Sequence, residues 1–426
     1  MVEPGPGLPS HIALLLNEEF DLSDPRLVAR KLRSMVRELK DQAEVGSFVP
    51  LPGLSEGESE FRAVLSGGLD LFASHGACQA HACRMGYADQ IARTVALMAD
   101  RVTAHDYFFE SIHDLRSRPT NGELSRLVSD VAVLHRIRPL IEMGLLTFTS
   151  PSMPLCGSCL AQFAERVQSL GDQAVARFGD QLSVERSEEG GHIGLAALYD
   201  PPLHIRFPES FLRSQSDDDI KAYFIHQAVR STLWDARSAA WVSGSVFSNS
   251  PVGISALLSV EGVGLSPPEL RVFAAERTAN LPWVAGLTIE QTLDLRDAAS
   301  QALPRLREFM ARRLSGTGEA GRGPSWIDTV SELREQAEEV RSELELATTR
   351  SRPLARNAVG ILGLAVSAAC LVADGPGSAL GGLIGTLGLV HGMSGGLEHH
   401  LAELQTRPGY VLVAARDILE HAQPAS

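Results

Sequence analysis

The chain contains little lysine and little cysteine, and each shortage argues against a class of protein. Only three of its 38 basic side chains are lysines, and the formal net charge is −14, so a surface that neutralises phosphates by non-specific nucleic-acid binding is not expected. Five cysteines are too few, and odd in number, for a disulfide framework. The N-terminal segment has no basic stretch before its short apolar run, unlike a secretory signal. We therefore expect a cytoplasmic protein that binds no nucleic acid.

The common catalytic motifs are also missing. The sequence holds no G-x-x-x-x-G-K-[ST], no G-x-S-x-G and no H-E-x-x-H, which argues against P-loop ATPases, α/β-hydrolases and zincins. A serine-rich stretch at residues 242–253 matches no nucleophile motif, and we interpret it as a loop. The sequence therefore favours a non-enzymatic protein over an enzyme.

What is present is the composition of a folded, helix-rich chain. Hydrophobic residues make up 44% and charged residues 21% of the sequence. Helical periodicity, with start signals such as Asp24–Pro25 and a capping box at Thr288 and Gln291, alternates with apolar runs of strand length such as residues 11–16. The predicted helices include residues 157–178, one that ends at Gly144, and one N-capped at Ser216 or Asp217. We predict the α+β class, with an N-terminal α/β region, a central mixed domain, and a C-terminal helical coil followed by a Gly-rich helical hairpin.

Changes in composition divide the chain further. At 426 residues it exceeds one ordinary core, and its clearest boundary is a linker rich in glycine. The predicted order is an α/β region (1–150), a mixed α+β domain (151–314), the linker (315–325), a coiled-coil-like helix (326–350), an apolar hairpin (351–400) and a C-terminal tail (401–426).

The coiled-coil-like helix is predicted from apolar residues at alternating steps of four and three, which form an a/d seam. They are Trp326, Val330, Leu333, Ala337, Val340, Leu344 and Ala347. Residues 326–350 carry seven acidic and three basic side chains, so the other faces are expected in solvent. The seam predicts self-association or an intramolecular helix pair.

The hairpin consists of two uncharged apolar runs, residues 358–372 and 377–390, on either side of a turn. Each run is shorter than the roughly 17–25 residues that cross a bilayer as a helix. Six glycines lie at near-helical spacing in and just after the second run, and we predict that they form one face on which another backbone packs closely. They are Gly377, Gly381, Gly385, Gly388, Gly392 and Gly396. Three interpretations stay open: a hairpin buried in a helical core, one that inserts into membranes conditionally, and a permanent anchor.

Four of the five cysteines form two close pairs, which predicts a structural zinc site. Cys156 and Cys159 have the C-x2-C spacing of one half of such a site, and Cys78 and Cys83 would supply the other half. His75 and His81 are alternative ligands. A redox-active C-x2-C pair and ordinary buried cysteines are the competing interpretations.

Acidic and histidine side chains also gather between His105 and Asp114. On a helix, Asp106, Glu110 and His113 would share one face, which is a weak candidate for a catalytic metal or acid–base cluster. A helix face in solvent is the competing interpretation. No residue pattern indicates an organic cofactor.

Two stretches, residues 134–151 ("LHRIRPLIEMGLLTFTSP") and 281–310 ("LPWVAGLTIEQTLDLRDAASQALPRLREFM"), resemble parts of a bacterial protein group to which no activity is attached. The resemblance implies one multi-part protein with a helical segment and an apolar stretch near the C-terminus. It assigns no site residue.

These patterns lead to three functional hypotheses. The favoured one is a non-enzymatic assembly or effector protein of a bacterial defence or toxin-like system, whose hairpin mediates oligomerisation or conditional membrane insertion, with itself, a lipid membrane or another protein as partner. Failure to release dye from liposomes in any state would count against the membrane part. The alternatives are a metal-dependent hydrolase that uses the His105–Asp114 cluster, and a plain scaffold with a buried hairpin.

Overall fold

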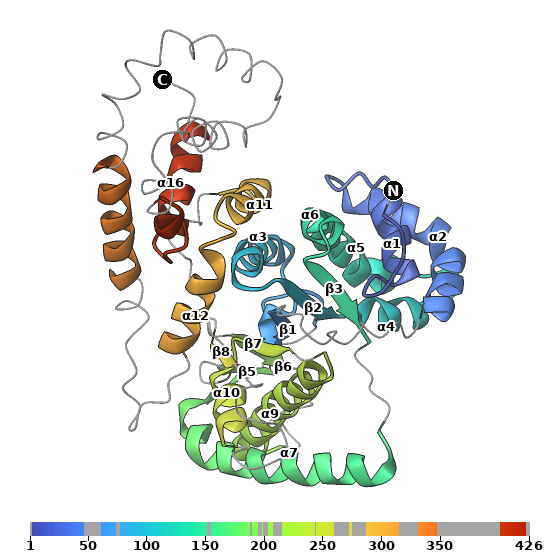
Figure 1. The fold of residues 1–426 in the computed structure, drawn as a ribbon. Coiled ribbons are helices and arrows are strands. Elements are labelled where there is room, and N and C mark those ends of the chain that lie inside the picture. The colour runs from blue at the N-terminus through green and yellow to red at the C-terminus, as the bar shows by residue number, and fades with distance from the viewer. Residues whose placement is uncertain are drawn as a thin grey trace. The chain divides into compact units, whose positions relative to one another are not determined.

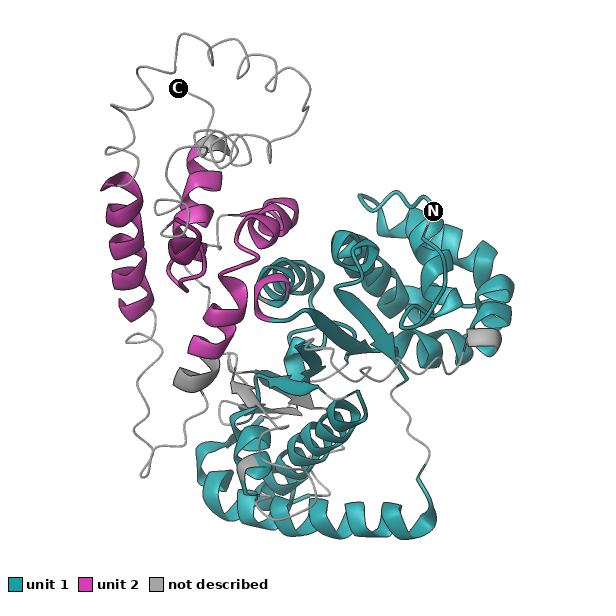
Figure 2. Cartoon of the chain, viewed as in Figure 1, with its two compact units in different colours: residues 1–95, 99–279 teal, residues 96–98, 280–426 magenta. Residues whose placement is uncertain are grey.

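A computed structural model describes the chain in two compact units (Figures 1 and 2). Unit 1 contains residues 1–95 and 99–279, and unit 2 contains residues 96–98 and 280–426. The residues described are 2–46, 61–73, 77–150, 155–187, 190–194, 198, 203–207, 215–242, 244–259, 272–274, 287–314, 331–346 and 401–422. The described part is helix-rich and has one parallel and one small antiparallel sheet, which confirms the predicted α+β class.

The centre of unit 1 is a five-stranded parallel sheet with the strand order β3-β2-β1-β7-β8. Its strands are β1 (Arg62–Ser66), β2 (Arg101–His105), β3 (Leu146–Thr149), β7 (Ser245–Ser248) and β8 (Val272–Ala274). All residues of β1 and β7 are buried, as expected for a parallel sheet with helices on both faces. The sheet takes strands from both sides of residue 150.

Helices connect successive strands of the sheet, because parallel neighbours need a long crossover. Helices α1 (Ser10–Asn17) and α2 (Pro25–Gly46) precede the first strand. The helices that follow it in unit 1 are α3 (His81–Met98, whose last three residues group with unit 2), α4 (Tyr107–His113), α5 (Asn121–Arg136), α6 (Arg138–Glu142), α7 (Gly157–Phe178), α9 (Asp217–Trp241) and α10 (Pro251–Leu258). Two short 3-10 turns are η1 (Gly67–Leu69) and η2 (Gly179–Gln181). The meander β4 (Ser183–Ser187), β5 (Gly190–Gly194) and β6 (His204–Phe207) forms the antiparallel sheet.

Several predicted elements are confirmed by their end signals. Helix α7 spans the predicted residues 157–178, α9 begins after a capping box at Ser216, and α11 (Ile289–Ala298) begins after the predicted box at Thr288. Each box satisfies backbone N–H groups that the first helical turn leaves unpaired.

Three local predictions differ from the structure. Residues 11–16 lie in helix α1 rather than a strand, because this helix is buried on most sides and shows no amphipathic period. The helix predicted to end at Gly144 is divided at Ile137 into α5 and α6. Pro139 follows the break, and its ring nitrogen has no hydrogen to donate to a carbonyl of the preceding turn. Gly144 nevertheless ends α6 as predicted, with φ of 69°.

The third difference concerns the serine-rich stretch, which we predicted to be a loop. Residues Ser245–Ser248 form strand β7, which pairs with β1 on one side and β8 on the other. Ser245 and Ser248 are both buried. The prediction was wrong because these serines lie at buried positions of a strand, where apolar residues are the usual signal.

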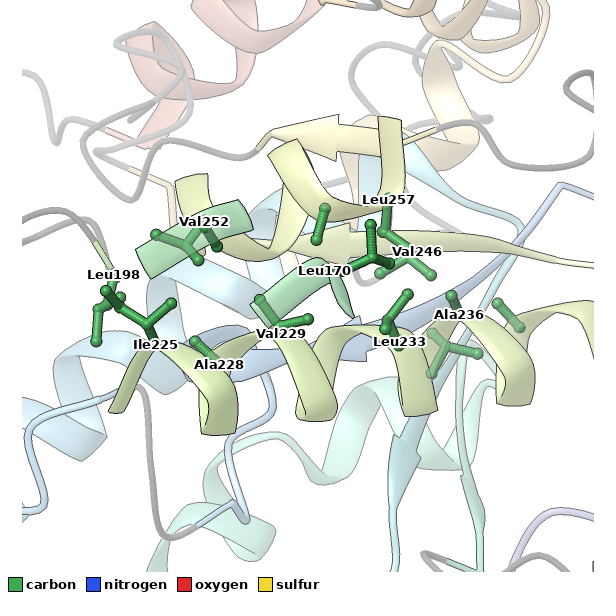
Figure 3. Packing of buried hydrophobic residues seen from close by; sticks show 14 of the residues in the cluster. Leu170, Leu198, Ile225, Ala228, Val229, Leu233, Ala236, Val246, Val252 and Leu257 are labelled. Atoms are coloured by element: carbon green, nitrogen blue, oxygen red, sulfur yellow. The ribbon is translucent and has the colours of Figure 1, made fainter. Parts of the chain in front are cut away.

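The core of unit 1 surrounds helix α9, which packs against β1, β7, α7 and α10 (Figure 3). Figure 3 shows Leu233 of α9 beside Leu170 of α7 and Val246 of β7, and Ile225 at the other end of the cluster beside Leu198. Helix α10 lies very close: a Cβ on Gly253 would be 2.0 Å from the Oγ1 atom of Thr232. This packing fixes the position of α9 beside the ends of β1 and β7.

Unit 2 is helical in its described part. It contains α11, α12 (Leu303–Leu314), the helical residues 331–346 and 401–405, and α16 (Tyr410–Ala422). In the predicted heptad seam, Leu333, Ala337 and Val340 are buried and Leu344 packs against Leu401 and Leu404. The seam is therefore the face that packs within unit 2, while Trp326, Val330, Ala347 and the whole hairpin at 351–400 lie outside the described residues.

Candidate functional site

Buried polar residues gather at the carboxyl edge of the parallel sheet. Ser66 ends β1, His105 ends β2 and Ser248 ends β7, and all three are at most 1% exposed. The chain after β1 proceeds to β2 and β3 on one side, whereas β7 and β8 lie on the other side of β1 (Figure 1). In open α/β sheets, such a reversal of strand order at the carboxyl edge is where ligands bind.

Asp70 orients the imidazole of His105. One carboxylate oxygen, Oδ2, accepts hydrogen bonds from both the backbone N–H of His105 and its Nδ1 atom, each at 3.0 Å. The other oxygen, Oδ1, accepts from the backbone N–H of Phe72 at 3.1 Å. Because a carboxylate only accepts, Nδ1 of His105 carries a proton whether the ring is neutral or charged.

The opposite ring nitrogen of His105 is held much less tightly. Its Nε2 atom lies 3.6 Å from Oδ1 of Asp235 and 3.5 Å from Oγ of Ser238, both on α9. These distances exceed the 2.7–3.2 Å of ordinary hydrogen bonds to nitrogen. Within the described residues, Nε2 is thus the one polar atom of the ring that has no short contact.

The second carboxyl group, that of Asp235, is destabilised in its charged form. Burial raises its pKa to about 6, against the opposing charge of nearby His105. The hydroxyl of Ser66 is fully buried and satisfies no standard hydrogen-bond geometry within the described residues. Near neutral pH, Asp235 therefore takes up a proton more readily than an ordinary carboxyl group does.

The pKa of His105 itself is raised. Burial favours the neutral ring, but the hydrogen bond to Asp70 and the charges of Asp235 and Asp70 together outweigh it. Tyr107, whose ring centroid lies 5.9 Å from that of His105, also has a raised pKa, because of burial and the same two carboxylates. The site thus has a negative potential that favours protonated and cationic groups.

A hydrogen bond joins the loop after β1 to the loop after β7 at the carboxyl edge of the sheet. Oδ1 of Asn249 accepts a hydrogen bond from the backbone N–H of Gly68 at 2.8 Å. Gly67 before it has φ of 62°, a conformation in which most side chains are strained. Ser250 then begins α10 by accepting from the N–H of Gly253. This frame holds both loops in fixed positions around the His105 cluster.

Comparison with known proteins identifies no relative of this chain. No protein-family model, curated protein or solved structure matches the chain. The interpretation of the site therefore depends on its own residues.

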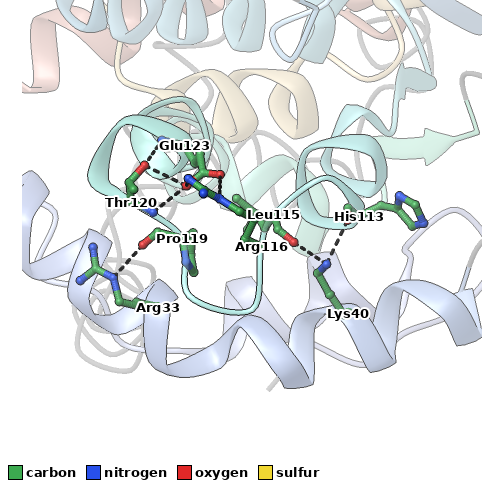
Figure 4. A network of polar contacts seen from close by, with 8 residues as sticks. All are labelled: Arg33, Lys40, His113, Leu115, Arg116, Pro119, Thr120 and Glu123. Carbon is green, nitrogen blue, oxygen red and sulfur yellow. Dashed lines mark hydrogen bonds and ion pairs between the residues drawn. The ribbon is translucent and has the colours of Figure 1, made fainter.

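The structure separates the predicted cluster between His105 and Asp114. Asp106 is buried, begins α4 by accepting from the N–H of Phe109, and pairs with His11 at 3.0 Å. Glu110 is exposed, and the ring of His113 is 70% exposed. Figure 4 shows that the imidazole of His113 points away from the other labelled residues, while its backbone carbonyl accepts from Lys40 at 3.0 Å. These three residues therefore do not form one site, and only His105 of this stretch joins the buried cluster.

The predicted zinc ligands lie at two helix starts. Cys78 lies three residues before α3, His81 is the first residue of α3 and Cys83 lies in its first turn, while Cys156 and Cys159 begin α7. None of these four cysteines forms a disulfide, and no group of three or more potential metal ligands occurs within the part of the chain that is described. His75 lies outside the described residues. The zinc site stays a prediction from the sequence.

The sequence alone did not identify Asp70, Asp235, Ser238 or Asn249 as site residues. Asp70 precedes His105 by 35 residues and Ser238 follows it by 133. A signal was present in the strand ends, since polar residues directly after buried strands mark the carboxyl edge of a parallel sheet. It was obscured because β7 was interpreted as a loop.

Proposed function

We propose that unit 1 binds a nucleotide at the carboxyl edge of its parallel sheet and that His105 acts there as a general acid–base toward the reacting substrate. The observation that carries this proposal is the asymmetry of the His105 ring. Nδ1 is fixed by Asp70 at 3.0 Å, whereas Nε2 has its nearest neighbours at 3.5–3.6 Å. An imidazole that is oriented through one nitrogen and has no short contact at the other is suited to general acid–base chemistry.

The ligand class follows from the sheet and from the charge of the site. The strand order 3-2-1-4-5, with its reversal at β1, is that of the doubly wound sheets that bind nucleotides at the carboxyl edge. Two carboxyl groups, Asp70 and Asp235, face one imidazole. They would accept hydrogen bonds from the hydroxyl groups of a ribose or attract a cationic ring, and they would repel the three phosphates of ATP more strongly than the two of NAD. NAD, whose nicotinamide ring is positively charged, therefore suits the site better than ATP.

The test is calorimetric titration of the full chain with NAD and with ATP. We expect NAD to bind with a dissociation constant between about 1 μM and 1 mM, the usual range for enzyme substrates, and ATP to bind more weakly. Ser238→Leu, which places a larger apolar side chain against Nε2, should weaken NAD binding at least tenfold. Ser125→Leu is the matched control, since this serine also bonds to a carbonyl of its own helix but lies exposed on α5. Absence of NAD binding, or equal binding by Ser238→Leu, would contradict the proposal.

The hypothesis of assembly or membrane insertion through residues 351–400 stays a prediction from the sequence, because that segment lies outside the described residues. Among the helices that the structure describes, none combines the length and apolar character needed to cross a bilayer. The proposed nucleotide site in unit 1 is independent of what this segment does.

A further inference from the structure

Two cysteines lie at the start of α7, three residues apart. Cys156 is the N-cap residue of this 22-residue helix and is exposed, and Cys159 in the first turn is partly exposed. The Cys156 sulfur lies 3.1 Å from the hydroxyl of Ser158. Residues three apart on a helix are neighbours on its surface, so the two cysteines lie on the same side of the first turn.

We propose that Cys156 and Cys159 are a reversible redox pair, in which Cys156 attacks a small-molecule disulfide and Cys159 then closes an intramolecular disulfide. The positions of the two residues support this order of attack. Cys156 is the more exposed thiol, so it reaches an oxidant in solvent, whereas Cys159 lies behind it on the helix.

The chemistry balances with a disulfide such as oxidised glutathione as the oxidant. The Cys156 thiolate attacks one sulfur of glutathione disulfide, which breaks the S–S bond and releases one glutathione thiolate. Cys159 loses its proton to solvent and attacks the Cys156 sulfur of the mixed disulfide, which releases the second glutathione thiolate. The protein loses two electrons and two protons, and one glutathione disulfide becomes two glutathione molecules.

The local environment favours the thiolate of Cys156. The hydroxyl of Ser158 lies within hydrogen-bond reach of its sulfur, and the unpaired N–H groups at the start of α7 stabilise a negative charge there. Residues three apart on a helix have Cβ atoms about 5–6 Å apart, whereas a disulfide needs about 3.5–4.5 Å. The first turn of α7 must therefore tighten slightly, which is easiest at a helix end.

The number of potential metal ligands near these thiols also favours a redox pair over a metal site. Two thiols supply half of a tetrahedral zinc site, and no third ligand accompanies them among the residues that the structure describes. Cys83 provides a comparison within the same chain, because it is equally exposed but lies on a different helix from this pair.

The test is incubation of the full chain with glutathione disulfide, followed by alkylation of free thiols and peptide mass spectrometry. We expect wild-type protein to form a disulfide between Cys156 and Cys159 that dithiothreitol reverses. Cys159→Ser should instead accumulate glutathione on Cys156, and Cys83→Ser should behave as wild type.

Two results would overturn the proposal. One is a wild-type protein that keeps glutathione on Cys156 without closing the disulfide, while circular dichroism shows it folded. The other is purified protein with one zinc ion per chain that is lost in Cys156→Ser, because both thiolates would then be metal ligands. Neither result bears on NAD binding, so this inference and the proposed function can fail separately.

Discussion

Replacing Arg84 by methionine is expected to lower the free energy of unfolding of unit 1 by about 3–5 kcal/mol. Arg84 is 4% exposed and donates to Oδ1 of Asp130 at 2.5 Å and to the carbonyl of Leu71 at 2.9 Å. Burial already raises the pKa of Asp130, against the opposing charges of Arg84 and Arg126. Without Arg84, this carboxyl group has to take up a proton or remain buried with too little positive charge. Hydrogen–deuterium exchange of β1 and β2 peptides in increasing urea measures the loss.

Two further variants separate the ion pair from general effects of the substitution. Lys31→Met removes a cation from the Lys31–Glu18 pair, whose side chains are 42% and 31% exposed, and should change the free energy by about 1 kcal/mol at most. Adding Asp130→Leu to Arg84→Met should restore much of the stability, since a buried pair replaced by apolar residues is often neutral. An Arg84→Met protein as stable as Lys31→Met would show that the pair contributes nothing.

Replacing Asp235 by asparagine is expected to stabilise unit 1 more at pH 6.5 than at pH 4. Burial raises the folded pKa of Asp235 from 3.8 to about 6, so the folded state binds a proton more tightly than the unfolded state. The stability from this group is fully present below pH 3.8 and is lost as the pH rises through 6. At about 1.4 kcal/mol per pKa unit, the wild type should lose about 3 kcal/mol relative to Asp235→Asn, which cannot ionise. Urea unfolding of both proteins at several pH values measures the difference.

Asp114→Asn is the matched control for this prediction. Asp114 lies 3.6 Å from His113, the same distance as Asp235 from His105, but its side chain is 85% exposed. Because solvent screens an exposed pair, Asp114→Asn should change the free energy of unfolding by about 1 kcal/mol at most. An Asp235→Asn protein whose difference from wild type is the same at pH 4 and at pH 6.5 would contradict the role given to Asp235.

Local signals in the sequence predicted much of the helical structure. The bounds of α7 and the capping boxes at Ser216 and Thr288 are encoded by residues within a single helical turn. Elements whose character depends on tertiary burial were harder to predict. Helix α1 is apolar on most sides, and β7 contains buried serines, so neither shows the period of its own secondary structure.

The candidate site was only partly accessible from the sequence. His105 was noticed because it lies beside other polar residues, yet its neighbours in sequence, Glu110 and His113, are exposed. Its actual partners, Asp70 and Asp235, reach it only because β1 pairs with β2 and α9 packs against β1. Contacts of this kind follow from the pairing order of the strands, which no local pattern in this chain specifies.

The most direct test of the central claim is an NMR titration of the His105 ring in the full chain, assigned by loss of its signal in His105→Gln. If Asp70 and Asp235 hold this imidazole between them, its pKa lies above 6.5 and falls in Asp70→Asn, where burial is opposed by one carboxylate fewer. A ring that titrates below 6.5, or that does not respond to Asp70→Asn, would show that the carboxylates do not control His105 and that the proposed acid–base site is wrong.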